Sequence, residues 1–158
     1  MATDDLFFPP GDAPPGAPPA LDGLPAPDFL NHPRTAEIIR QALAEDLGSG
    51  DHTSLATIPA EARGRVRCLF KAEGTVAGVA FAQRVFEALE PGVEFKVEIP
   101  DGARALRGDV LFTVKGRIHT LLSGERLALN ALQRMSAIAT LAAQAADLVS
   151  HTRCRVLD

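Results

Sequence analysis

Proline placement at the start of this 158-residue chain limits what its first thirty residues can form. Nine of the twelve prolines lie close together, at Pro9, Pro10, Pro14, Pro15, Pro18, Pro19, Pro25, Pro27 and Pro33. Each proline lacks a backbone N–H donor and fixes its own φ, so neither a helix nor a sheet propagates through such a stretch. We therefore predict that residues 1–30 form a disordered tail with polyproline character and that the ordered domain begins near Pro33.

The rest of the chain has the composition of a globular protein, with 46% hydrophobic and 23% charged residues. The net charge is -4 and the sixteen Lys and Arg form no basic run, which argues against nucleic acid or a membrane surface as a partner. Asp4 and Asp5 stand where a signal peptide would carry Lys or Arg, and no apolar run approaches the roughly 20 residues of a spanning helix. Cys68 and Cys154 match no metal or redox spacing. We therefore expect a cytoplasmic protein.

Apolar residues recur at helical spacing from Ile38 to Leu47. Pro33 suits the first turn of a helix, and Gly48 suits the left-handed position just past its end. The sequence therefore predicts a helix that ends near Leu47 and a loop over residues 48–53.

The apolar period changes to two over residues 65–73, which indicates a half-buried antiparallel strand. A short helix is predicted over 79–89, a second strand over 93–99 and a third over 110–115, with room for a fourth over 117–119. Strands that are grouped in the sequence and flanked by helices favour an α+β fold.

After Thr120 the pattern stays helical for about thirty residues, and alanines, which favour helix, dominate residues 137–146. Because this length exceeds the usual range for a small domain, we expect more than the small sheet to pack on this helix. Residues 154–158 have the pattern of a strand that is only starting. We therefore expect the chain to stop where a second domain begins.

One group of polar residues surrounds a glycine loop and contains Glu45, Asp46, Asp51 and His52. These side chains include good metal ligands, but Glu45 and Asp46 are neighbours on a helix and point about 100° apart. A metal needs ligands that converge with a definite geometry. Asp51 fits better as a turn residue that hydrogen-bonds the backbone, so no metal ligand is assigned here.

A second group lies on the long helix, where Arg126 and Asn130 are four residues apart and share a face. A guanidinium presents a planar fork that fits a carboxylate or phosphate at two points. This face could therefore meet an anionic ligand, or it could be an ordinary exposed polar face. Spacing alone favours the exposed face.

Glycine-rich turns between short strands also occur in lipoyl and biotinyl carrier modules, which present a lysine at an exposed hairpin tip. Lys71, Lys96 and Lys115 instead fall within or at the end of predicted strands. This placement weighs against a non-catalytic carrier or interaction module but leaves it open.

Three motifs together resemble one family, quinolinate phosphoribosyltransferase, also called nicotinate-nucleotide pyrophosphorylase (carboxylating). They are Ala-Leu-Ala-Glu-Asp-Leu-Gly with Gly-Asp-His-Thr (42–53), Glu-Gly-Thr-Val-Ala-Gly (73–78), and Gly-Glu-Arg with Leu-Asn and Ser-Ala-Ile-Ala-Thr (124–140). Their order and gaps match over about residues 33–158. Leu127 replaces the usual Thr and Ala137 the usual Gly, and neither change removes a charged group.

The resemblance implies a fold and a reaction. The fold would be an N-terminal α/β sandwich domain, an antiparallel sheet with helices over 31–120. Residues 121–158 would be the linking helix and the first strand of a truncated α/β barrel. The enzyme transfers the phosphoribosyl group of phosphoribosyl pyrophosphate to the ring nitrogen of quinolinate. Decarboxylation gives nicotinate mononucleotide, CO2 and pyrophosphate for NAD synthesis, and Mg²⁺ is required.

The resemblance also implies a homodimer whose active site lies between one subunit's barrel and the other's N-terminal domain. By this resemblance, Arg126 matches the arginine that contacts a quinolinate carboxylate in the neighbouring subunit's site. The resemblance therefore favours a binding role for Arg126 over the ordinary exposed polar face that spacing alone favours. No catalytic residue is assigned, because the barrel's Thr-Arg-Lys-Thr motif is absent, and the Mg²⁺ site is expected mainly in the barrel. We therefore expect the chain alone to be inactive. A paralogue of the same fold from molybdenum transport operons remains an alternative.

Overall fold

A computed structural model of the chain describes residues 29–48, 50–154 and 156. Apart from Phe29 and Leu30, the tail predicted for residues 1–30 lies outside the described residues, as do Arg155, Leu157 and Asp158 of the strand predicted at the end. The elements in chain order are α1 (Pro33–Leu47), α2 (His52–Thr57), β1 (Arg63–Leu69), β2 (Gly74–Thr75), α3 (Val79–Leu89), β3 (Glu94–Val97), β4 (Arg104–Ala105), β5 (Val110–Arg117) and α4 (Ile118–Val149).

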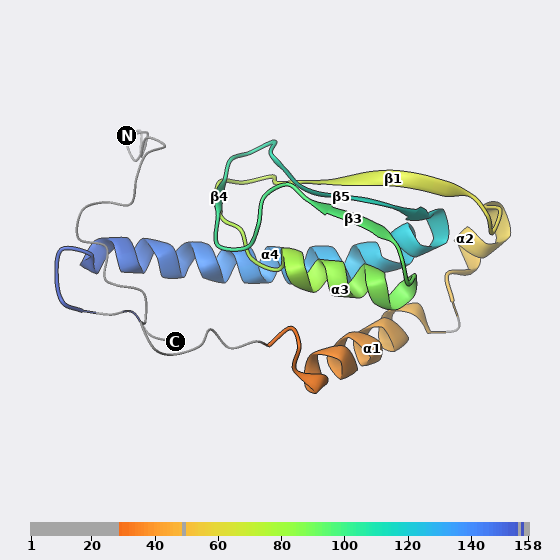
Figure 1. Cartoon of the computed structure of the whole chain (residues 1–158), viewed down its shortest axis with the longest axis horizontal. Coiled ribbons are helices and arrows are strands. Elements are labelled where there is room, and N and C mark those ends of the chain that lie inside the picture. Colours follow the sequence, from red (N-terminus) through yellow and green to blue (C-terminus); the bar gives the residue numbers. More distant parts are fainter. Residues whose placement is uncertain (1–28, 49, 155, 157–158) are drawn as a thin grey trace.

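The described residues form layers of sheet and helix (Figure 1). The main sheet is antiparallel with the order β1-β5-β3, and β2 and β4 form a separate two-stranded pair. Helices α3 and α4 lie side by side against one face of the main sheet, and α1 packs on these helices from the side away from the sheet. This arrangement confirms the α+β prediction.

The main core fills the space between the sheet and the helices, and alternate residues of β5 from Phe112 onward are buried against it. Phe112 and Val114 are buried there, while Lys115 on the opposite face pairs with Glu94 of β3. The buried residues of this core are Val76, Val79, Ala82, Phe86, Val93, Ala105, Leu111, Phe112, Val114, Leu121, Ala128 and Leu132. A second, smaller cluster joins α1 to α3 through Ile39, Leu43 and Val85.

Several predicted boundaries were wrong. Residues 117–119 are not a fourth strand, because β5 ends at Arg117 and α4 starts at Ile118. The predicted loop over 48–53 includes the first residues of α2, whose N-cap is Asp51. Strand β1 starts at Arg63 and ends at Leu69, where its pairing with β5 shifts register.

Helix α4 has 32 residues, and its two halves differ in their surroundings. Its N-terminal half packs on α3 and the sheet, whereas Ile138, Leu141 and Leu148 in the second half are 62–77% exposed. The expectation that something further packs on this helix stays a prediction. None of the helices in the described ranges is long and apolar enough to cross a lipid bilayer.

Candidate functional site

Two of the three motifs meet along α4, where the segment 73–78 crosses the helix at very short range. A Cβ on Gly74 would lie 2.3 Å from Thr140 Oγ1, so only glycine allows this approach. The Thr75 N–H donates to Thr140 Oγ1 at 2.9 Å, and the Ala77 N–H donates to Ser136 Oγ at 3.0 Å. The Ser136 hydroxyl in turn donates to the Ala77 carbonyl at 3.1 Å. The Ser136 and Thr140 hydroxyls therefore bond the backbone of segment 73–78 to helix α4.

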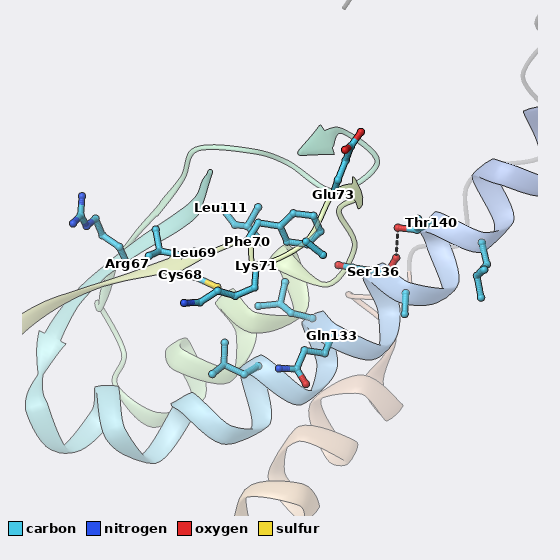
Figure 2. A pocket seen from close by; sticks show the side chains of 15 residues that line it. Arg67, Cys68, Leu69, Phe70, Lys71, Glu73, Leu111, Gln133, Ser136 and Thr140 are labelled. Atoms are coloured by element: carbon cyan, nitrogen blue, oxygen red, sulfur yellow. Dashed lines mark hydrogen bonds between the residues drawn. The ribbon is translucent and has the colours of Figure 1, made fainter. Parts of the chain in front are cut away.

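A groove of about 760 Å³ opens beside this crossing. One wall consists of residues 67–73, and the other is the face of α4 from Leu129 to Leu141 (Figure 2). Most of its lining is apolar, and the Ser136 and Thr140 hydroxyls inside it are already hydrogen-bonded to backbone groups. The groove thus offers a mainly apolar contact surface, with the charged residues Arg67, Lys71 and Glu73 on one wall.

The remaining motif residues meet on the other side of the helices, at Arg126. This arginine lies on α4 with its side chain 75% exposed, and its Nη1 donates to Asp46 Oδ1 at 3.1 Å. Asp46 belongs to the last turn of α1, and its side chain is 24% exposed. The fold therefore brings together the first motif and the third, which are 80 residues apart.

Apolar contacts hold α1 against α3 and α4 at this point. Leu47 and Leu127 both pack against the cluster of Ile39, Leu43 and Val85. Leu127 is the position at which the family pattern has Thr, so its larger apolar side chain adds to this cluster. The Arg126–Asp46 pair lies beside a contact that is already apolar and packed.

Arg126 is well suited to bind an anion. An exposed ion pair is weak, of the order of 0–1 kcal/mol, so Asp46 does not sequester the guanidinium. Within the described part of the chain, no other group accepts a hydrogen bond from Arg126, and the rest of its five N–H donors stay available. Asn130 is exposed one turn further along the helix.

Asp51 hydrogen-bonds a backbone group, as predicted, but it does so as the N-cap of helix α2 and not within a loop turn. The Asp51 carboxylate accepts from the Ser54 N–H at 3.1 Å and from the Ser54 hydroxyl. Asp51 thereby caps the N-terminus of α2. These hydrogen bonds from Ser54 hold the pKa of Asp51 below its ordinary value. No three His, Cys, Asp or Glu residues among those described are grouped so that they could hold a metal ion.

Two of the three lysines that bear on a carrier role lie within strands, as the sequence predicted, whereas Lys71 lies outside the strands. Lys96 is within β3 and Lys115 within β5, and each pairs with a nearby glutamate. Lys71 follows the end of β1 and lines the groove. Neither Lys96 nor Lys115 is therefore presented at a hairpin tip.

One anchoring residue was missed by sequence reasoning. Glu90, at the end of α3, is 7% exposed and accepts from the Arg117 N–H at 2.9 Å. It also forms ion pairs with Arg63 at 3.3 Å and with Arg117 at 3.5 Å. Burial raises the pKa of the Glu90 carboxyl, but hydrogen bonds from Arg117 and Thr120 and the charges of Arg117 and Arg63 outweigh it, so the net pKa is lowered. The only sequence signal is an acid just before Pro91-Gly92 at a helix end.

Comparison with known proteins gives a consistent answer. A family model described as the N-terminal domain of quinolinate phosphoribosyl transferase matches residues 51–136. A quinolinate phosphoribosyltransferase [decarboxylating] 1b of Nicotiana tabacum is 40% identical over 111 residues, which are 70% of this chain and 32% of the tobacco protein. A probable nicotinate-nucleotide pyrophosphorylase [carboxylating] of Synechocystis is 35% identical over 120 residues, 76% of this chain and 40% of that protein.

The fold agrees with these sequence relatives. The crystal structure of NadC from Streptococcus pyogenes superposes with a TM-score of 0.71 and 31% identity, covering 73% of this chain and 41% of the other. The chain therefore spans between about a third and two fifths of the length of these relatives. On the family match, the sequence identity and the shared fold, the chain belongs to the quinolinate phosphoribosyltransferase family and contains its N-terminal domain.

Proposed function

We propose that this chain is the N-terminal part of an enzyme that makes nicotinate mononucleotide in NAD synthesis. The enzyme would join the phosphoribosyl group of phosphoribosyl pyrophosphate to the ring nitrogen of quinolinate and release CO2 and pyrophosphate. The observation that carries this proposal is Arg126, an exposed arginine held by one contact where two family motifs meet. The names of the tobacco and Synechocystis relatives support the same reaction.

The chemistry of the substrates fits a cation at this place. Quinolinate carries two carboxylates, and a guanidinium binds a carboxylate through two parallel N–H···O bonds. We propose that Arg126 takes one of these carboxylates and orients the ring, in a site completed by the barrel of the partner subunit in a homodimer. Arg126 would thus act by binding and positioning, and bond making would belong to groups outside the described residues.

The proposal also includes a metal ion and a cellular compartment. Mg²⁺ would accompany phosphoribosyl pyrophosphate, whose phosphates it neutralises, but the described residues contain no carboxylate cluster that fits it. The ligands of Mg²⁺ would therefore belong to residues outside the described ranges. The proposed compartment is the cytoplasm, because Cys68 and Cys154 are both free thiols, which suits a reducing environment.

The proposal is tested by kinetics of the full-length enzyme that carries this domain. Wild type is expected to form nicotinate mononucleotide from the two substrates, and Arg126→Ala to lower kcat/KM for quinolinate about 100-fold, because a charged partner of the substrate is lost. Arg134→Ala is the matched control, since Arg134 is also an exposed cation on α4. Absence of product from wild type, or equal effects of the two variants, would contradict the proposal.

A further inference from the structure

The guanidinium of Arg126 donates a hydrogen bond within the described residues through one nitrogen, Nη1. Its Nη1 donates to Asp46 Oδ1 at 3.1 Å, and among the residues that the structure describes this is its single partner. The edge formed by Nε and Nη2 is thus left without an acceptor. This edge can hold a carboxylate by two parallel hydrogen bonds.

Asp46 has a side chain with fewer torsions to order than that of the arginine it contacts, and this side chain is less exposed. Its side chain is 24% exposed, against 75% for Arg126, and its backbone belongs to the last turn of α1. A long arginine side chain with this much exposure has many rotamers, and ordering it on ligand binding costs free energy. An acceptor fixed beside it before the ligand arrives reduces that cost.

We propose that Asp46 is a positioning residue for substrate binding, which holds the Arg126 guanidinium with its open edge directed at a carboxylate of the substrate. This inference rests on the proposed function. It assigns a role to the aspartate of the Glu-Asp-Leu-Gly motif, which the site so far did not use. Because the pair is exposed, the charge of Asp46 is screened from the incoming anion, and the orientation of the arginine is the larger effect.

A role as a structural tie is the competing explanation for the pair. The two helices are already joined by the apolar contacts of Leu47 and Leu127 with the cluster of Ile39, Leu43 and Val85. An exposed ion pair adds little to such a contact. Loss of the carboxylate should therefore change ligand binding while leaving the thermal stability of the domain almost unchanged.

The test uses Asp46→Ala in the full-length enzyme, with Glu45→Ala as the matched control. Glu45 is the adjacent residue of α1, is exposed and has no partner among the described residues, so its replacement removes the same charge without touching Arg126. Asp46→Ala removes the acceptor and is expected to raise KM for quinolinate about fivefold, with kcat and KM for phosphoribosyl pyrophosphate within about twofold of wild type. Asp46→Asn keeps a side-chain oxygen that can accept from Arg126 and should recover most of the loss.

A double-mutant cycle separates positioning from a structural role. If Asp46 acts through Arg126, Asp46→Ala has no further effect on KM in the Arg126→Ala background. Unchanged KM in Asp46→Ala, an equal change in Glu45→Ala, or an additive effect in the double variant would overturn the inference. If Arg126→Ala raises KM and Asp46→Ala does not, only the positioning role fails. If wild type makes no product, the proposed function fails and the inference with it.

Discussion

Single residues at the crossing of segment 73–78 over α4 decide how closely the backbone approaches the helix. In Gly74→Ala the new Cβ would lie 2.3 Å from Oγ1 and 3.0 Å from Cγ2 of Thr140. Thr140 cannot turn away easily, because its β-branched side chain has few rotamers and its hydroxyl is bonded to Thr75 N–H and to the Ser136 carbonyl. We expect Gly74→Ala to lower the free energy of unfolding by about 2 kcal/mol in denaturant titrations of the chain.

The control for this change is Gly64→Ala in β1. A Cβ there would lie 3.4 Å from Ile118 Cγ1, which is an ordinary contact, so the effect should stay below about 1 kcal/mol. Thr140→Ala in the Gly74→Ala background removes the obstructing atoms and should recover part of the loss. A Gly74→Ala chain as stable as wild type would contradict the close approach.

At the scale of elements, Glu90 connects the end of α3 to β1 and to the β5–α4 corner through Arg63 and Arg117. The folded-state pKa of Glu90 is lowered from its ordinary value of 4.5, so its contribution to stability is present above that pH. The contribution is lost as the pH falls through the lower folded-state pKa. Glu90→Gln should cost about 2 kcal/mol of unfolding free energy at pH 7, and this gap to wild type should narrow below about pH 4.5.

Urea titrations at pH 7 and at several lower pH values measure this gap, with Glu87→Gln as the control. Glu87 lies on the same helix and pairs at 3.5 Å with Arg84, but both side chains are at least 36% exposed. Its replacement should change stability little at any pH. A gap for Glu90→Gln that stays constant down to pH 3 would show that its charge does not matter.

The elements that periodicity predicted are those long enough to repeat a pattern. Helices α1, α3 and α4 and the central part of β5 each contain several turns or alternations, and they lie where the sequence placed them. Helix α2 has six residues and β2 and β4 have two each, so none repeats an apolar pattern often enough to be seen. Arg126 was predicted from its motif, whereas its pairing with Asp46 depends on the packing of α1 against α4, which no local pattern contains.

At the scale of the whole molecule, the ion pairs show how many cations remain for binding anionic substrates. Several cations of the described residues pair with glutamates, among them Lys96, Lys115, Arg40, Arg63 and Arg84. Arg126 instead pairs with Asp46, at the junction of two family motifs. Quinolinate and phosphoribosyl pyrophosphate together carry several negative charges, which one exposed arginine cannot neutralise. Under the proposed function, the described residues would therefore supply only a part of the site for these substrates.

We accordingly expect the purified 158-residue chain to form no nicotinate mononucleotide, while the full-length enzyme at equal concentration does. The measurement is product formation from quinolinate, phosphoribosyl pyrophosphate and Mg²⁺ against a reaction without protein. Circular dichroism and a cooperative urea transition of the same sample show that the chain is folded, so that inactivity is not a result of unfolding. Turnover by the chain above the protein-free reaction would contradict this expectation, because the domain would then hold a complete site.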